Sequence, residues 1–441
     1  MIEADDKTIG ETMNFLLATW EGGGSVTPVL TVARKLADRG HRVRVMSDRV
    51  NRPEAEASGA AFIPWTRAPS RPDRSRDSDI MRDWEAANPQ DGFVRVLHRI
   101  MAGPALAYAQ DVIEELRREP ADLVVSNEML FGVPLGCEAL GQKLALLTCN
   151  VSLFPMAGVP PLGPGLPPAQ TDEEHALHAQ ITEASRQMLD GGLPAVNAAR
   201  TALGLAPLAT LTDQHLVAER LLLGTARAFD FAPAELPAHI AYVGPQLGDP
   251  AWAAPWQSPW DASDPRPLVL VSFSTTFQGH VDVLQRVVDG AADLPLRLLV
   301  TLGDTIAPDE LKPAANCRLL PNAPHNAVMP EAALVVTHGG HGTVTRALVH
   351  GKPLVVVPHG RDQADNAVRV TTRGAGIMVP ADSDAEAFRV AIAEILAEPA
   401  YRASAEILCA KVAEEADNSP VVKELETLVR QGRMGKERKA A

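Results

Sequence analysis

The stretch that decides the fold is "ALVVTHGGHGTVTRALVHGKPLVVVPHGRDQADNAVRV", from Ala333 to Val370. A short apolar run leads through glycines into an amphipathic segment, and a second apolar run, loop and helical segment follow. Glycine lets the backbone turn sharply where a strand passes into a helix, so this order predicts a β-α-β unit. Strands joined in this way lie parallel, and we therefore predict a parallel sheet in this half of the chain.

The same alternation recurs in the N-terminal half. Within residues 13–48, the apolar run "NFLLATW" precedes a helix that starts near Pro28 and has one apolar stripe, and a second strand follows Gly40. A helical stretch is also expected from Phe93 to Arg118. Residues 244–267 are rich in Pro, Trp and Asp and have no periodicity, and the alternation restarts after them. A chain of 441 residues is too long for one ordinary core. We expect an α/β protein with two doubly wound sheets.

Composition excludes several classes of function. The net charge of −14 opposes binding to nucleic acids and acidic membranes. No apolar run approaches the ~20 residues of a membrane span, and the acidic start does not resemble a secretory signal. The four cysteines lack the spacing of a metal site. Reduced thiols in a cytoplasmic protein, without disulfides or bound metal, are therefore expected.

Two loops of the opening stretch suit a nucleotide-sugar. After the strand that ends at Thr337, the turn from His338 to Thr343 brings backbone N–H groups and an imidazole to a helix N-terminus, which is typical of a phosphate site. Asp362 and Gln363 follow the next strand, at the edge where open α/β sheets bind ligands. A carboxylate and an amide suit sugar hydroxyls. Each loop alone is a weak signal. Their order and spacing, with a phosphate site at one loop and a polyol site at the next, predict that the ligand is a nucleotide-sugar.

This arrangement resembles the donor-binding signature of the family 1 nucleotide-sugar glycosyltransferases, which have the GT-B fold. The resemblance covers most of the chain and is strongest from 268 to 380. It implies a cleft between an acceptor-binding and a donor-binding domain. The implied segments are a disordered extension (1–12), the N-terminal acceptor domain (13–243), a linker (244–267), the C-terminal donor domain (268–418), and a helix returning to the N-terminal domain with a frayed tail (419–441).

The resemblance assigns donor-binding residues one by one. The diphosphate is expected at the glycine-rich turn and the loop after residue 273, the base near 322–325, and the sugar at Asp362 and Gln363. The full donor-binding set is Ser274, Thr275, Asn322, Ala323, His325, His338, Gly340, His341, Gly342, Thr343, Asp362 and Gln363. No metal or other cofactor is needed in this picture, because helix ends and N–H donors neutralise the departing diphosphate.

Two donor-side positions depart from the family's pattern. Many members grip the ribose hydroxyls with a Glu where this chain has Arg346, and Arg cannot accept a hydrogen bond. This favours a deoxyribose donor such as a dTDP-sugar, with Arg346 pointing to solvent or to a phosphate as the alternative. Asn322 stands where many relatives stack an aromatic residue on the base. The sequence therefore leaves UDP and dTDP open.

The N-terminal loop "GGGSVTP" departs further. The family uses a His there as general base and orients it with an Asp at the end of a later strand. Ser25 and Asn127 stand at these two positions, and a neutral serine is no base unaided. Three interpretations remain open. An active enzyme takes its base from elsewhere; a partly ionised acceptor needs little base and Ser25 only orients it; or the protein is a non-catalytic binding helper or regulatory relative. Candidate bases are Glu128, His98 and His280.

The acceptor is expected to be a small hydrophobic polyketide, phenolic compound or terpenoid. The residues expected to line its pocket are Trp20, Phe131, Phe154 and Met156. The favoured function is inverting, metal-independent transfer of a sugar from a dTDP- or UDP-sugar by a monomer or homodimer. A nucleotide-sugar epimerase of the same fold is a further alternative. The proline-rich loop 154–170 argues against it, because an epimerase lacks an acceptor pocket.

Overall fold

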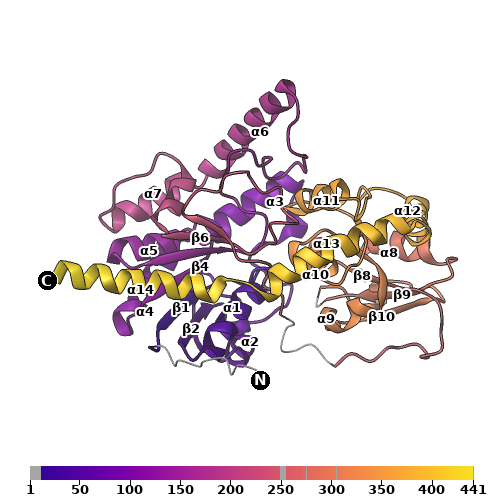
Figure 1. Ribbon diagram of the computed structural model, residues 1–441, viewed down its shortest axis with the longest axis horizontal. Coiled ribbons are helices and arrows are strands. Elements are labelled where there is room, and N and C mark those ends of the chain that lie inside the picture. Colours follow the sequence, from indigo (N-terminus) through magenta and orange to yellow (C-terminus); the bar gives the residue numbers. More distant parts are fainter. Residues whose placement is uncertain (1–10, 249–254, 275, 304, 441) are drawn as a thin grey trace, which may run out of the picture.

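The structure is a computed structural model that describes residues 11–248, 255–274, 276–303 and 305–440 (Figure 1). Most of the expected N-terminal extension, residues 249–254 of the expected linker, and Thr275 lie outside these ranges. Two parallel sheets with helices on both faces form the two halves of the molecule, as the sequence predicted.

The N-terminal sheet has the strand order β3-β2-β1-β4-β5-β6-β7. Its strands are β1 (Asn14–Ala18), β2 (Arg42–Ser47), β3 (Ala61–Pro64), β4 (Leu123–Asn127), β5 (Leu144–Thr148), β6 (Arg220–Leu223) and β7 (Ile240–Tyr242). Chain order reverses between β1 and β4, where Phe15 pairs with Leu123. Ligands of doubly wound sheets bind beyond the carboxyl ends of the strands at such a point. The loop that carries Ser25 follows β1, and Asn127 ends β4.

Alternating side chains of β1 supply both cores of this half. Leu16 packs with the helices on one face, whereas Phe15 and Leu17 pack with α1 and the C-terminal helix on the other. The helices are α1 (Val26–Asp38), α2 (Arg52–Ala57), α3 (Pro89–Val96), α4 (Ala105–Arg118), α5 (Gly132–Leu140), α6 (Asp172–Asp190) and α7 (Leu193–Ala202). The apolar stripe expected on α1 is buried, including Val29 and Leu36.

The C-terminal sheet repeats the same plan in the order β10-β9-β8-β11-β12-β13. Its strands are β8 (Leu268–Ser272), β9 (Arg297–Thr301), β10 (Cys317–Leu320), β11 (Ala332–Thr337), β12 (Leu354–Val356) and β13 (Gly376–Met378). Its helices are α8 (Val281–Ala291), α9 (His325–Val328), α10 (His341–Val349), α11 (Gln363–Thr372), α12 (Ala385–Ala397) and α13 (Pro399–Asp417). The reversal lies between β8 and β11, beside the predicted phosphate turn.

The last helix, α14 (Val421–Ala440), leaves the C-terminal half and runs along the N-terminal half (Figure 1). Its residues Val421, Leu425, Leu428 and Val429 are buried in the core that α1 and β1 share. Glu426 lies 3.0 Å from His41 Nε2, just before β2. One continuous C-terminal segment therefore packs on both sheets. No helix in the described ranges is both long and apolar enough to cross a membrane.

One predicted helix is interrupted. The sequence predicted a helical stretch from Phe93 to Arg118, whereas a π-helical turn (Leu97–Met101) separates α3 from α4. A Cβ at Gly103 would lie 1.8 Å from the carbonyl oxygen of His98, so the chain turns there at a residue without one. Pro104 follows and has no N–H to continue a helix. The short strands β6, β7 and β13 and the helices α6 and α7 were not predicted.

Candidate active site

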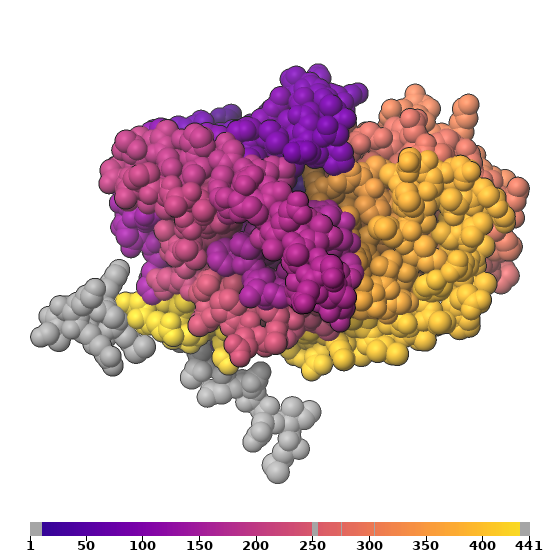
Figure 2. All heavy atoms as spheres, turned by 90° about the horizontal axis from the view of Figure 1, so that it is seen from above, coloured from indigo at the N-terminus to yellow at the C-terminus, as the bar shows by residue number. Residues whose placement is uncertain are grey.

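A cavity of about 930 Å³ lies between the two halves, which meet closely in Figure 2. From the N-terminal half it is lined by the loop after β1 and by residues 149–156 and 159–164 after β5. From the C-terminal half it is lined by the loops after β8, β11 and β12. The cavity therefore lies at the switch points of both sheets, where the loops carrying the predicted site residues converge.

The structure brings the expected donor-binding residues together around this cavity. Those within the described residues that line it are Ser274, Asn322, Ala323, His325, His338, Gly340, His341, Gly342, Thr343, Asp362 and Gln363. The remaining member of the set, Thr275, lies outside the described residues.

The turn after β11 needs its glycines. Gly339 has φ +95°, and a Cβ there would lie 2.8 Å from Val356. A Cβ at Gly340 would lie 2.6 Å from Nε2 of His338, so the imidazole covers this glycine at the start of α10. Burial lowers the pKa of His338 to about 3, so the ring is neutral at pH 7. The turn thus offers N–H donors at a helix N-terminus rather than a fixed charge.

Two further histidines stand behind this turn. The ring of His280 lies 5.7 Å from that of His338 and 4.3 Å from that of His359. Burial, with smaller contributions from His338 and His359, lowers the pKa of His280 to about 2. His280 is not among the residues that line the cavity. Its position and low basicity both oppose the hypothesis that it acts as the general base.

A series of hydrogen-bonded side chains, which the sequence did not reveal, joins the loop after β8 to the loop after β12. Gln278 Nε2 donates to Ser274 Oγ (2.9 Å), and Gln363 Nε2 donates to Gln278 Oε1 (3.1 Å). Gln363 Oε1 accepts from the backbone N–H groups of His359 (2.7 Å) and Gly360 (3.2 Å). Gln363 therefore shapes its own loop and fixes it to the loop after β8. In space, Gln278 lies between the predicted residues Ser274 and Gln363, and only the tertiary fold reveals this position.

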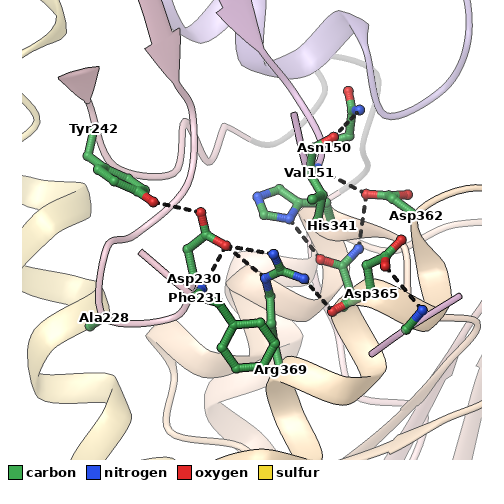
Figure 3. A network of polar contacts seen from close by, with 12 residues as sticks. Asn150, Val151, Ala228, Asp230, Phe231, Tyr242, His341, Asp362, Asp365 and Arg369 are labelled. Atoms are coloured by element: carbon green, nitrogen blue, oxygen red, sulfur yellow. Dashed lines mark hydrogen bonds and ion pairs between the residues drawn. The ribbon is translucent and has the colours of Figure 1, made fainter. Parts of the chain in front are cut away.

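Asp362 and Asp365 hold the acceptor-side loops against α11 (Figure 3). Asp362 Oδ2 accepts from the N–H of Val151 (3.2 Å) and from Asn366 Nδ2 (3.0 Å). Asp365 accepts from the N–H groups of Gly163 (2.8 Å) and Gly165 (3.2 Å). The proline-rich loop is thus docked on the helix that carries the expected sugar-binding pair. Burial raises the pKa of Asp365 to about 6.

Ser25 and Asn127 lie on either side of a cysteine. Ser25 precedes α1 and lines the cavity, but its side chain does not cap the helix. Its carbonyl accepts from Thr19 Oγ1 (2.9 Å) and from Cys149 Sγ (3.7 Å). Asn127 Nδ2 donates to Cys149 Sγ (3.3 Å), and its Oδ1 accepts from the N–H of Met129 (2.9 Å). Cys149 therefore connects the positions at which the family pattern pairs His with Asp.

Glu128 is buried beside this group. Ser152 Oγ donates to its Oε2 (3.0 Å), and the N–H of Leu153 donates to its Oε1 (3.3 Å). Burial, with a smaller contribution from the charge of Asp362, raises the pKa of Glu128 to about 8. Glu128 does not line the cavity, whereas Ser152 does. The remaining candidate base, His98, is exposed and lies away from the cavity lining.

Three of the four residues expected to line the acceptor pocket lie at the cavity. Trp20, Phe154 and Met156 line it. Phe131 is fully buried, with its ring stacked on His215 at 4.9 Å, and does not line the cavity. The unpredicted helix α6 adds Met188 to the wall. The sequence analysis missed Met188 because the region around α6 has no motif that points to a binding site.

Arg346 does not point to solvent. It is 9% exposed and lies in the cavity wall. Its Nε donates to Asn326 Oδ1 (2.8 Å), and its Nη2 donates to the carbonyl of Gly248 (2.8 Å). The solvent orientation considered from the sequence is therefore wrong. The guanidinium joins the end of the N-terminal half to the helix after the phosphate turn.

The described residues contain no cluster of three or more His, Cys, Asp or Glu side chains arranged to hold a metal ion. The cavity instead combines two helix N-termini, the neutral imidazole of His338 and hydrogen-bonding side chains on one wall with an apolar loop on the other. This combination defines a binding site for a phosphorylated polar ligand facing a less polar one.

Comparisons with known proteins agree with this class. Residues 285–428 match the C-terminal domain of the erythromycin biosynthesis protein CIII-like family. The 4'-demethylrebeccamycin synthase of Lentzea aerocolonigenes is 28% identical over 398 residues, which cover 88% of this chain and 93% of that protein.

Solved structures share the fold over nearly the whole chain. The glycosyltransferase of kitacinnamycin has a TM-score of 0.74 at 18% identity, covering 95% of this chain and 99% of the other. The glycosyltransferase VinC in complex with dTDP has a TM-score of 0.63 at 20% identity, covering 95% and 100%. The two parallel-sheet halves therefore have the GT-B fold. Over most of its length the chain is thus similar to a natural-product biosynthesis enzyme, and it shares its fold with solved natural-product glycosyltransferases.

Proposed function

We propose that this enzyme transfers a sugar from a dTDP- or UDP-sugar to a small hydrophobic acceptor, with inversion and without a metal or other cofactor. One observation carries the proposal. The N-termini of α10 and α11, with His338 and Asp362, face the same cavity as the apolar loop from Phe154 to Met156. A donor on the first wall and an acceptor on the second would meet between them.

Backbone N–H groups at the start of α10 would bind the diphosphate. A helix N-terminus stabilises an anion, and its effect grows as the leaving group gains charge. Ser274 would add a hydroxyl donor to the phosphate oxygens, with the neutral His338 ring packed against the same turn. Asp362 would accept hydrogen bonds from sugar hydroxyls at the next loop. Because these groups supply the electrostatic stabilisation, the chemistry needs no divalent cation.

Transfer would proceed as one in-line displacement. The acceptor oxygen forms its bond to the anomeric carbon as the bond to the diphosphate oxygen breaks, and the diphosphate leaves with the electron pair. Nucleophile and leaving group lie on opposite faces of the anomeric carbon, which inverts its configuration. Residues from both halves of the protein line the cavity, and this supports an approach of the acceptor from the face opposite the diphosphate.

The occupied guanidinium of Arg346 supports a dTDP-sugar as the preferred donor. Its donated hydrogen bonds go to Asn326 and Gly248, and it has no acceptor atom for a ribose 2′-hydroxyl. The structural relative VinC was solved with dTDP, which agrees with this preference. The name of the rebeccamycin-synthase relative supports a natural-product acceptor. A cytoplasmic monomer or homodimer remains our expectation for its state in the cell.

A direct assay tests the proposal. The purified protein is incubated with dTDP- and UDP-sugars and a panel of phenols, macrolides and terpenoids, with and without EDTA. We expect a glycoside of higher mass, at a faster rate from the dTDP-sugar, unaffected by EDTA, and with the anomeric configuration opposite to that of the donor by NMR. A retained configuration or loss of turnover in EDTA would contradict the mechanism. Nucleotide binding without any turnover would instead support the non-catalytic helper.

A further inference from the structure

The missing histidine leaves the acceptor's proton without a destination, and the structure offers one close by. Glu128 follows directly after β4, and Ser152 lies in the loop after β5. Ser152 Oγ donates to Glu128 Oε2 at 3.0 Å, and the N–H of Leu153 donates to the other carboxylate oxygen at 3.3 Å. Ser152 borders the cavity, while Glu128 is fully buried behind it.

This pair lies between the expected sugar and acceptor positions. The preceding residue, Val151, donates its N–H to Asp362, on the sugar side (Figure 3). At the other end of the same short segment, Cys149 contacts the carbonyl of Ser25, on the side where the family places its base. The segment from 149 to 152 therefore connects Ser25, where the family has its base, with Asp362, the carboxylate expected to bind the sugar. Ser152 lines the cavity on this path, and its Oγ accepts one hydrogen bond from the N–H of Phe154 at 3.1 Å, which leaves its second lone pair for a proton.

We propose that Ser152 and Glu128 form a proton relay that replaces the family's histidine, an inference that rests on the proposed glycosyltransferase function. As the acceptor oxygen attacks the anomeric carbon, its proton passes to Ser152 Oγ, and the Ser152 proton passes to Glu128 Oε2. The carbon–diphosphate bond breaks in the same step. Serine ends the step neutral. Before the next turnover, Glu128 returns its new proton to Ser152 Oγ, and the Ser152 proton passes to water in the cavity.

The surroundings of Glu128 give its carboxylate the proton affinity that this role requires. Asp362 is the charged group that acts on its pKa, and the negative charge of Asp362 opposes ionisation of Glu128. His215, whose Nε2 lies 2.9 Å from the carbonyl of Glu128, is neutral because burial lowers its pKa to about 4. Cys149 remains a thiol, since burial raises its pKa to about 12. Asn127 carries no charge. Burial thus leaves Glu128 with a pKa of about 8, well suited to a general base.

The sign of the pH dependence follows. Glu128 accepts a proton only when ionised, and the ionised fraction rises as pH increases through about 8. With an aliphatic alcohol acceptor, kcat/KM of the wild-type enzyme is expected to rise with pH and to level off above that value. In Glu128→Gln this rise should disappear, because the amide cannot take the proton.

Three variants and two acceptors test the relay. With an aliphatic alcohol, Glu128→Gln and Ser152→Ala should lower kcat/KM by about 10²- to 10⁴-fold, the range for lost acid–base catalysis, and Ser152→Thr should keep most of the rate. With a nitrophenol that is already ionised, the losses should stay below about tenfold, because no proton needs to be removed. Affinity for dTDP, measured by calorimetry, should be unchanged and shows that each variant is folded.

The outcomes separate the relay from the function on which it rests. Equal losses with both acceptors, or a wild-type pH profile in Glu128→Gln, would overturn the relay while leaving the transferase function intact. If Glu128→Gln does not fold, Ser152→Ala with its Ser152→Thr control decides the matter at the cavity surface. A wild-type enzyme that glycosylates neither acceptor at any pH would overturn the proposed function itself.

Discussion

At the scale of single residues, Ser25 contributes its backbone more than its side chain. Its carbonyl accepts two hydrogen bonds that tie the start of α1 to β1 and to the loop after β5. The residue lines the cavity, and its hydroxyl makes no capping bond to the helix. The residue at the family's base position is therefore held in place by contacts that any amino acid could make.

We predict that Ser25→Ala preserves both stability and most of the activity. The bonds to its carbonyl remain, and no capping bond is lost, so thermal denaturation should occur at the wild-type temperature. The rate of transfer should fall by less than about tenfold, since loss of a true base costs about 10²- to 10⁴-fold.

Asp384→Ala is the matched control for stability. Asp384 caps α12 and accepts from the N–H of Ala387 at 2.9 Å. Its loss should lower the free energy of unfolding by about 1 kcal/mol, as is usual for a helix cap. A rate loss near a thousandfold in Ser25→Ala would show that the hydroxyl takes part in proton removal and would contradict our assignment.

At the scale of elements, the loop between β6 and β7 is locked to α11 by a buried ion pair (Figure 3). Arg369 Nε donates to Asp230 Oδ1 at 2.8 Å, and Tyr242 Oη donates to the other carboxylate oxygen at 2.7 Å. Arg369 also donates to the carbonyl of Asp365 at 2.9 Å. Since α11 begins with Gln363, this pair fixes the orientation of the helix that carries the expected sugar-binding residues.

We predict that Arg369→Met lowers the free energy of unfolding by about 3–5 kcal/mol, because it leaves the buried Asp230 carboxylate without its cation. The double variant Arg369→Met with Asp230→Asn should recover part of this loss, since the unpaired charge is gone. Urea denaturation followed by circular dichroism measures both.

The exposed Arg389, paired with Glu386 on α12, provides the control. Arg389→Met should leave the denaturation midpoint unchanged, because solvent screens such pairs. A double variant at least as unstable as Arg369→Met would show that the lost stability does not come from an uncompensated charge. The pair would then stabilise the protein chiefly through packing around Arg369.

The sequence predicted those features that depend on local patterns. The β-α-β units and the turn from His338 to Thr343 follow from apolar periodicity and glycine placement, which neighbouring residues fix. The Asp230–Arg369 pair joins residues far apart in the chain, and no local signal connects them. Ser152 is likewise an ordinary loop serine until the fold places it on Glu128. From the sequence, Phe131 and Phe154 have the same expected role as aromatic pocket residues. In the structure, the ring of Phe131 stacks on His215 and is buried in the core.

At the scale of the whole molecule, contacts on several sides hold the two halves together. Arg361 pairs with Asp83, and the rings of Trp84 and Phe277 meet edge to face at 5.7 Å, so the segment between β3 and α3 contacts the C-terminal half. Asp362 and Asp365 hold the proline-rich loop from the other direction. The helix α14 completes this arrangement, because it extends from the C-terminal half along the face of the N-terminal half (Figure 1).

This last connection predicts an uneven response to a mutation in α14. Leu425 is fully buried in the core shared with α1 and β1, so Leu425→Ala should cost about 2–5 kcal/mol of stability in the N-terminal half. Hydrogen exchange followed by mass spectrometry should show faster exchange in α1, β1 and β2, with β8 to β13 unchanged. Affinity for dTDP should stay within about twofold, because the expected donor-binding residues lie in the other half. The exposed Lys423 on the same helix gives the control variant Lys423→Ala, with wild-type exchange throughout. Equal loss of protection in both sheets would show instead that the two halves unfold as one unit and that α14 stabilises the pair rather than the N-terminal half.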